Sequence, residues 1–344
     1  MRKTAAIIWL ALVLAGCNGG EDETPETLEL LTHDSFAGAV TDETFAAFTE
    51  STGIEVEVIA AGDAGSLVNQ AVLSTDNPLA DVLFGVDDTF LSRALDNDIF
   101  AEFESSLIDT VPDSLIIDDT GRATPISFGD VCINYDKERY DNGLEVPTTL
   151  DDLRQERYAS QLTVEHPATS SPGLAFMLAT IDEYGEEDWP DFWEDLKAAG
   201  TRVAPDWDTA YFSDFSHHGG SSSLVVSYAS SPPAEVINAE EPSDQAPTGV
   251  IHAGCYRQVE FAGILAGTSY PTAAGQLIDY MLSLEFQEQV PLSWFVFPAN
   301  SNAALPDEFV AHTVLPESPA QLDPSEIAAN RERWIQEWVA VMEG

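Results

Sequence analysis

The sequence is short of positive charge. Of its 344 residues only 13 are Lys or Arg, against 60 Asp or Glu, which leaves a formal net charge of −47 at pH 7. Lysine is the scarcer basic residue and occurs only at Lys3, Lys137 and Lys197. A chain of this charge is repelled by phosphate backbones and anionic lipid surfaces. We therefore expect no nucleic-acid partner.

The acidity does not indicate disorder. Disordered acidic chains have too few apolar residues to bury, whereas 44% of this chain is hydrophobic and 10% is aromatic. We expect a folded protein whose acidic surface is solvated and whose self-repulsion is screened by concentrated salt. The scarcity of Lys beside many Asp and Glu resembles proteins of extreme halophiles.

Long hydrophobic runs are also scarce, and the apolar stretch at the N-terminus is too short to span a bilayer comfortably. It follows the basic pair Arg2 and Lys3 and ends in "LAGC" at Cys17. This pattern resembles a lipoprotein signal, so we predict a signal peptide over 1–17, lipidation of Cys17 and a flexible tether over 18–27. An ordinary signal peptide with a chance cysteine is the alternative. The protein is then exported and lipid-anchored to the outer face of the cytoplasmic membrane, at the cell surface or in the periplasm.

Cysteine is rare, and only Cys132 and Cys255 follow the signal. An exported location permits a disulfide between them, while two buried free thiols are the alternative. Both lie in long strand-like segments, at 123–137 and 255–268. If these two strands run side by side, the cysteines meet, and we favour the disulfide for that reason.

Strand and helix patterns alternate along the chain. Strands are predicted at 27–33, 54–62 and 80–87, and helices at 41–53, 66–74 and 89–100, which indicates a parallel α/β sheet. The alternation restarts after 123–137, where residues 148–164 give a helix followed by a strand. Further helices are predicted at 174–185, 189–200, 271–290 and 323–342, and further strands at 201–204 and 222–232. We therefore expect two lobes, the first of residues 28–125 with 256–344 and the second of residues 126–255. Ligands of such sheets bind in a crevice at the carboxyl ends of the strands.

No catalytic motif is present. His33, Asp34 and Ser35 are the residue types of a hydrolytic triad, but neighbours in an extended segment point to opposite faces, and no G-x-S-x-G turn supplies a nucleophile. The pair His217–His218 has no Cys or Glu at metal-ligand spacing, so we expect a surface loop there and no metal site. Phosphate-binding glycine loops are absent as well. We expect neither an enzyme nor a cofactor.

Other segments favour the binding of a small molecule. The stretches at 62–69 and 166–176 lead into helix N-termini, which offer free backbone N–H groups. The loops at 205–212, 227–232 and 292–298 each carry an aromatic residue, and aromatic faces suit flat rings and cations.

An ordered set of motifs carries a resemblance from about Leu30 to Pro298. It comprises "LLTHDSFAG", "AGDAGSLVNQAVL", "ADVLFGVDDTFLSRA", "INYDK", "TSSPGLAFML", "DWDTAYFSDF", "VVSYASSP" and "SWFVFP". The chain resembles the substrate-binding proteins of ABC importers, and among them the thiamine-binding proteins. The resemblance implies an α/β, two-lobed, periplasmic-binding-protein-like (type II) Venus-flytrap fold with two crossing strands. It also implies a monomer that captures thiamine or its phosphates and delivers them to an ABC permease and ATPase complex.

The same resemblance implies a set of ligand-binding positions. They are His33, Asp63, Ala64, Ser170, Ser171, Trp207, Tyr228, Ala229, Ser230, Ser231 and Trp294. The chain departs from the family pattern at His33 and Ala234, where Tyr is usual, and at Ala64, where Gly is usual. His33 leaves a ferric-ion-binding protein of the same fold open, because such sites combine Tyr and carboxylate oxygens with a His, but Tyr228 is followed by Ala229 and not by a second Tyr. A secreted hydrolase is the alternative from a different functional class.

Overall fold

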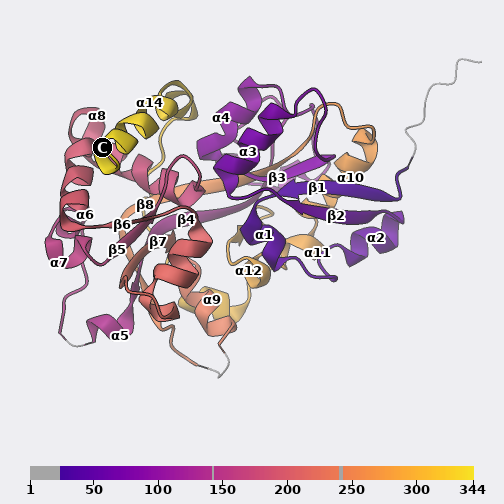
Figure 1. Ribbon diagram of the computed structural model, residues 1–344. Helices are drawn as coiled ribbons and strands as arrows, with labels where there is room; N and C mark the ends of the chain where they lie inside the picture. Colours follow the sequence, from indigo (N-terminus) through magenta and orange to yellow (C-terminus); the bar gives the residue numbers. More distant parts are fainter. Residues whose placement is uncertain (1–23, 142, 240–242) are drawn as a thin grey trace, which may run out of the picture.

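The computed structural model describes residues 24–141, 143–239 and 243–344 (Figure 1). The predicted signal peptide and the lipidation site at Cys17 lie outside these residues. The predicted tether ends earlier than expected, because Pro25 is buried and Thr27 already opens the first strand. Within the described ranges, no helix combines the length and the apolar character needed to cross a membrane.

One mixed sheet runs through the described part of the molecule, with strand order β2-β1-β3-β8-β4-β7-β5-β6 and β9 beside β4. The strands β1, β2 and β3 are parallel to one another, as are β5, β6 and β7. The bounds are β1 (Thr27–Thr32), β2 (Glu55–Ala60), β3 (Val82–Asp87), β4 (Thr124–Asp136), β5 (Leu162–Glu165), β6 (Arg202–Ala204), β7 (Leu224–Tyr228), β8 (Thr248–Ile264) and β9 (Phe297–Pro298).

Helices cover the sheet in two groups, one around β1–β3 and one around β5–β7 (Figure 1). The first group comprises α1 (Asp34–Ala39), α2 (Ala46–Thr52), α3 (Ala64–Leu73), α4 (Asp88–Asp96), α10 (Pro271–Leu282), α11 (Leu284–Gln287) and α12 (Val290–Ser293). The second comprises α5 (Lys137–Tyr140), α6 (Leu150–Leu153), α7 (Glu156–Ala159), α8 (Ser171–Ala199) and α9 (Ser231–Ile237). The described elements also include the short helical turns η1 (Ile108–Thr110), η2 (Asp113–Leu115), η3 (Thr209–Asp214) and η4 (Ser216–His218). The last two helices are α13 (Asp307–His312) and α14 (Pro324–Met342).

The two groups are joined by the long strands β4 and β8, which pair antiparallel from Thr124 opposite Ala262 to Asp136 opposite Thr248. This is the pair of crossing strands that the sequence predicts, although β8 begins at Thr248, before the predicted start at residue 255. Cys132 on β4 and Cys255 on β8 form a disulfide. The adjacent Ala229, just after β7, packs against the disulfide. The predicted disulfide is therefore present, and it lies where the two lobes are connected.

Several helix boundaries differ from the predicted ones because local caps decide them. The helix predicted over 41–53 begins only at Ala46, since the Thr44 hydroxyl accepts a hydrogen bond from the Thr41 backbone N–H at 3.0 Å and closes a turn. Gly53 ends it in the left-handed region, as predicted. The separate helices predicted at 174–185 and 189–200 are confirmed, since the backbone of α8 is non-helical at Gly185 and the element consists of two helices that meet at a kink there. The helix predicted over 271–290 stops at Leu282, because Ser283 caps α11.

The C-terminal helix α14 packs against both α4 and α8 (Figure 1). Its apolar residues Ile327, Trp334 and Trp338 are buried, and Asp323 caps the helix by accepting a hydrogen bond from the Ser325 N–H. The Trp338 ring lies 5.5 Å from that of Trp193 in α8. The helix thus contacts elements of both predicted lobes. The division into residues 28–125 with 256–344 and residues 126–255 therefore stays a prediction.

Candidate functional site

A cavity of about 270 Å³ lies between the two groups of elements. It is lined by the end of β1, the N-termini of α3 and α8, the η3–η4 segment, the end of β7 with α9, the crossing strand β8, and the segment after α12. Small-molecule sites are usually pockets of about 300–1,000 Å³, so this cavity suits a small ligand. Its place at the carboxyl ends of β1 and β7 is the one expected for an α/β sheet.

Eight of the eleven predicted ligand positions line this cavity: His33, Asp63, Ala64, Ser171, Trp207, Tyr228, Ser231 and Trp294. The other three do not. Ser170 and Ser230 are buried at the N-caps of α8 and α9, and Ala229 is buried against the disulfide. The cavity lining also includes residues outside the predicted ligand positions: Ser35, Pro172, Tyr211, Phe212, His218, Ala234, Glu235, Asn238, Gln258, Glu260, Phe295 and Val296.

One wall of the cavity is aromatic. The rings of Trp207 and Tyr211 stack with centroids 5.1 Å apart and an interplanar angle of 15°. The indole N–H of Trp207 donates to the Ser227 hydroxyl at 3.0 Å and fixes the ring. Tyr228 stands edge-on to Trp207 at 6.4 Å. Such a fixed face is suited to a flat or cationic ring.

Asp63 places a carboxylate in the same cavity. It is the N-cap of α3, where its Oδ1 atom accepts from the Ala64 N–H at 2.8 Å. Its Oδ2 atom is buried and accepts no hydrogen bond within the described residues. Burial raises the pKa of Asp63, although the Ala64 N–H, the His33 charge and the nearby Ser170 hydroxyl oppose this rise. A buried oxygen of this kind favours a ligand that brings a positive charge or an N–H donor.

His33 has two defined roles. Its Nδ1 atom accepts from the Phe36 N–H at 3.2 Å and caps α1, while its Nε2 atom lies 3.3 Å from Oε1 of Glu260 on β8. Gly85 leaves room for the ring, because a Cβ there would lie 2.2 Å from the imidazole Cδ2. Burial by itself lowers the pKa of His33, but the Glu260 carboxylate reverses this and the pKa is raised. The neutral imidazole therefore caps a helix and donates to an acid on the crossing strand, whereas the protonated ring keeps only the pair with Glu260.

We expect His33→Asn to remove a pH-dependent part of the stability. Asn caps helices well, so α1 keeps its cap while the pair with Glu260 is lost. Because the folded-state pKa of His33 is raised, the pair stabilises the wild type fully below the unfolded-state pKa, and this contribution is lost as pH rises through the folded-state pKa. The difference in unfolding free energy between wild type and variant should shrink with rising pH in urea titrations. A constant difference would contradict this.

The two lobes also meet at a buried polar junction below the cavity. Ser171, at the start of α8, donates its hydroxyl to Asp87 at the end of β3. The neighbouring Asp88 accepts from the Tyr256 hydroxyl at 3.0 Å and from the Val259 N–H at 2.9 Å, both on β8. Burial raises the pKa of both carboxyl groups, and the charge of Asp87 raises the pKa of Asp88 further. Ser171 thus lines the cavity and links the lobes.

An acidic second cavity of about 390 Å³ adjoins the first and shares Ser35, Asp63 and Trp207 with it. Its other acidic lining residues are Asp34, Asp206 and Asp208. Burial and the charge of Asp206 raise the pKa of Asp208. This concentration of carboxylates gives the second cavity a negative potential that attracts cations.

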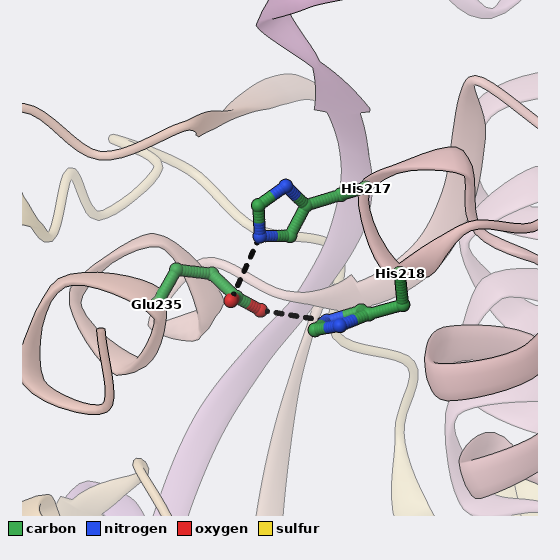
Figure 2. A group of neighbouring side chains, drawn as sticks. All are labelled: His217, His218 and Glu235. Atoms are coloured by element: carbon green, nitrogen blue, oxygen red, sulfur yellow. Dashed lines mark hydrogen bonds and ion pairs between the residues drawn. The ribbon is translucent and has the colours of Figure 1, made fainter. Parts of the chain in front are cut away.

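The loop of His217 and His218 is not a simple surface loop. Both imidazole Nε2 atoms lie 3.0 Å from the carboxylate of Glu235, which belongs to α9 (Figure 2). The hydroxyl of Tyr211 donates to the same carboxylate at 2.7 Å. His218 and Glu235 line the cavity. The sequence gives no sign of this group, because Glu235 lies 18 residues after His217.

Comparison with known proteins gives consistent matches. The family model described as bacterial extracellular solute-binding protein matches residues 77–314. A thiamine-binding periplasmic protein of Escherichia coli (strain K12) is 30% identical over 316 residues, which cover 90% of this chain and 92% of that protein. A solved periplasmic thiamin binding protein superposes with a TM-score of 0.81 at 27% identity, covering 92% of this chain and 96% of that one. Iron-bound HitA from Pseudomonas aeruginosa superposes with a TM-score of 0.72 at 21% identity, covering 91% and 99%, and shows the fold alone.

Proposed function

Because this chain belongs to the family of bacterial extracellular solute-binding proteins, we propose that it captures thiamine or a thiamine phosphate and delivers it to an ABC importer. The family membership confirms the resemblance drawn from the sequence motifs, and the structural matches confirm the two-lobed type II fold. The protein is an extracytoplasmic solute-binding protein and not an enzyme, so the hydrolase alternative is wrong.

One observation carries the thiamine proposal: the buried, unpartnered Oδ2 of Asp63 shares a cavity with the stacked rings of Trp207 and Tyr211. Thiamine consists of a thiazolium ring with a fixed positive charge and an aminopyrimidine ring. The aromatic face suits either ring. The carboxylate is able to accept a hydrogen bond from the amino group of the pyrimidine or to offset the positive charge of the thiazolium. The acidic second cavity supports the proposal, since its potential attracts a cation to a position beside the first cavity.

The ferric alternative rests on His33 and on the iron-binding structural neighbours. His33 is paired with Glu260, and the Tyr228 hydroxyl donates to Gln258 at 3.3 Å. Residue 229 is Ala, so no second Tyr follows. A hard ferric ion needs several free oxygen ligands, whereas the Glu260 carboxylate is paired with His33 and the Glu235 carboxylate with two histidines. The observations therefore favour an organic cation over the ferric ion.

We further propose that the mature protein is a monomer, anchored to the outer face of the cytoplasmic membrane by lipid on Cys17, and that it docks on a permease and ATPase complex. The sequence before and around Cys17 supports the anchor. The short stretch between Cys17 and β1 serves as the tether in this proposal.

Isothermal titration calorimetry in concentrated salt tests the ligand directly, with thiamine, thiamine phosphates and Fe³⁺ as separate titrants. We expect heat and saturation with at least one thiamine form, together with a higher melting temperature, because a ligand that binds only the folded state stabilises it. Absence of binding by every thiamine form would refute the proposal. Binding of Fe³⁺ alone would establish the ferric alternative.

Trp207→Ala should weaken thiamine binding by about 2 kcal/mol, or about 30-fold, because it removes the ring face that stacks on Tyr211 and borders the cavity. The matched variant Trp207→Phe keeps an aromatic face and should retain most of the affinity. Calorimetric titration of both variants with thiamine measures the difference. Equal affinities of the alanine variant and the wild type would remove this ring from the site.

A further inference from the structure

His217, His218 and Glu235 form a second candidate binding site at the edge of the cavity (Figure 2). The turn η4 supplies the two imidazoles and the helix α9 supplies the carboxylate. One ligand atom from each residue lies within 4.8 Å of the other two. We propose that these three side chains bind a divalent transition-metal ion of the Zn²⁺ type. This inference goes beyond the proposed function, since none of the three is among the residues to which we assign thiamine binding.

The donor set is that of a zinc site. Two imidazole nitrogens and one carboxylate oxygen are typical Zn²⁺ ligands, with metal–ligand distances of about 2.0–2.2 Å. Such distances in a tetrahedral site place neighbouring ligand atoms about 3.3–3.6 Å apart, slightly farther than the two pairs found here. The two N–O separations here are both 3.0 Å, with each imidazole facing a different carboxylate oxygen. An ion can therefore join the three groups with small side-chain rotations.

The surroundings hold these side chains in place. The Tyr211 hydroxyl donates to Oε1 of Glu235 at 2.7 Å, and hydrogen-bonded partners of this kind orient metal-ligating carboxylates. The side chains of His217 and His218 each keep 25% of their surface exposed, and that of Glu235 keeps 13%. The ring of His218 also packs against Tyr211 with centroids 5.2 Å apart. The cluster is thus ordered by its neighbours and still open to an ion from solvent.

The donor chemistry also sets the selectivity. Mg²⁺ and Ca²⁺ prefer oxygen ligands, whereas imidazole nitrogen suits Zn²⁺, Cu²⁺ and Ni²⁺. Cys132 and Cys255 form a disulfide and offer no thiolate that competes for the ion. The alternative interpretation is that the cluster consists only of ion pairs between the two imidazoles and Glu235 and binds no metal. The two interpretations differ in the effect of pH, since metal binding requires neutral imidazoles and weakens as pH falls.

The test is calorimetric titration of Zn²⁺ into the EDTA-stripped mature protein, in concentrated KCl with excess Mg²⁺ and without thiamine. We expect one Zn²⁺ per chain, with affinity reduced by more than about 100-fold in His218→Ala and Glu235→Gln. Tyr211→Phe should reduce the affinity by about 10-fold. The matched control is His252→Ala, which removes an exposed histidine elsewhere and should leave binding unchanged.

Two further measurements distinguish a loss of metal binding from a loss of folding. Circular dichroism and melting curves in EDTA establish that each variant is folded, and His217→Ala replaces any variant that is not. Zn²⁺ should raise the melting temperature of the wild type and of His252→Ala, and should raise that of His218→Ala and Glu235→Gln much less. Equal Zn²⁺ affinity in wild type, His218→Ala and Glu235→Gln would overturn the proposal, as would the absence of stoichiometric binding in the wild type. Since no thiamine is present, this outcome is separate from a failure of the thiamine proposal.

Discussion

Asp63→Asn should weaken thiamine binding by at least about 30-fold while leaving the free energy of unfolding close to that of the wild type. Truncating one partner of a buried, hydrogen-bonded charge pair costs about 2–5 kcal/mol of binding free energy, and about 1.4 kcal/mol corresponds to tenfold. Asp63 is also the N-cap of α3. Asn caps helices as well as Asp does, so the variant removes the charge and keeps the cap.

The wild type should also lose affinity for thiamine as pH falls. The pKa of Asp63 is raised, so its carboxylate becomes protonated at a higher pH than an ordinary Asp, and the neutral acid no longer offsets the thiazolium charge. Asp63→Asn should lack this pH dependence. Calorimetry at several pH values measures both effects.

The matched control for this variant is Asp323→Asn, which changes the same residue type at another helix N-cap, at the start of α14. It should bind thiamine with wild-type affinity. If Asp63→Asn also binds with wild-type affinity and the same pH profile, the Asp63 carboxylate does not contact the ligand.

Replacement of both Cys132 and Cys255 by Ala should lower the free energy of unfolding by about 2–5 kcal/mol. The disulfide joins residues 123 positions apart and so restricts a long loop of the unfolded chain. It also ties β4 to β8 where the two lobes are connected. Ala is preferred over Ser, because both sites are buried and a hydroxyl there needs a partner. Urea unfolding followed by circular dichroism gives the measurement.

The control for this second variant is the wild type in reductant, which keeps the side-chain volume and loses only the cross-link. It should unfold at nearly the same urea concentration as the double alanine variant. The alanine variant itself should be insensitive to reductant. A wild type whose stability does not change with reductant would show that the bond contributes little to folding.

Much of the fold was predictable because it depends on local patterns. Alternating apolar residues and helix-ending glycines lie within single elements, so β1, β2 and β3 and the end of α2 at Gly53 follow from short stretches of sequence. The long crossing strands were recognisable for the same reason, since each is a long continuous run. The ordered motifs also predicted eight of the twenty residues that line the cavity.

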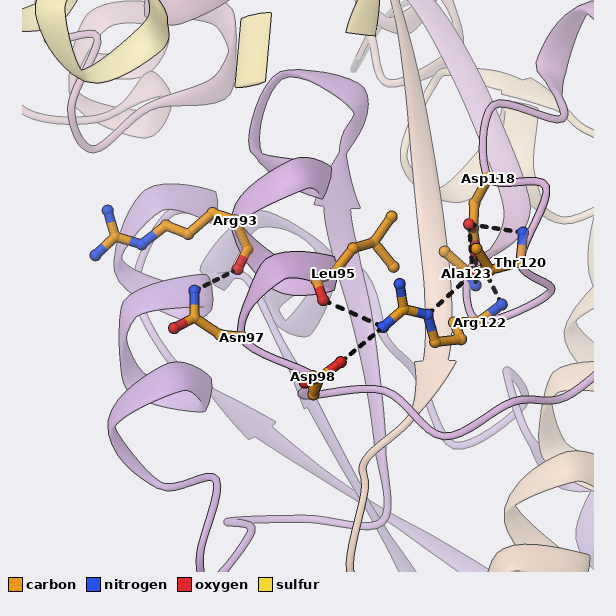
Figure 3. Close-up of polar contacts among 8 residues, drawn as sticks. All are labelled: Arg93, Leu95, Asn97, Asp98, Asp118, Thr120, Arg122 and Ala123. Atoms are coloured by element: carbon orange, nitrogen blue, oxygen red, sulfur yellow. Dashed lines mark hydrogen bonds and ion pairs between the residues drawn. The ribbon is translucent and has the colours of Figure 1, made fainter. Parts of the chain in front are cut away.

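Connecting loops were less predictable because distant contacts decide their conformation. The loop before β4 is an example (Figure 3). The Asp118 carboxylate accepts hydrogen bonds from the N–H groups of Thr120, Arg122 and Ala123, and these bonds lower its pKa against the effect of partial burial. The Arg122 guanidinium then donates to the Leu95 carbonyl and to Asp98 at the end of α4. No short stretch of sequence predicts that Arg122 binds residues near the end of α4.

The sequence by itself determined the acidic character, the order of strands and helices, the family, and the residue types of the binding loops. Only the tertiary structure decided which side chains meet. His33 pairs with Glu260 and the two histidines of η4 pair with Glu235, because strands and helices far apart in the chain are packed together. The same packing turns Ala229 toward the disulfide and places Tyr211 on Trp207. A residue's neighbours in space depend on the whole sheet, and short stretches of sequence do not contain that information.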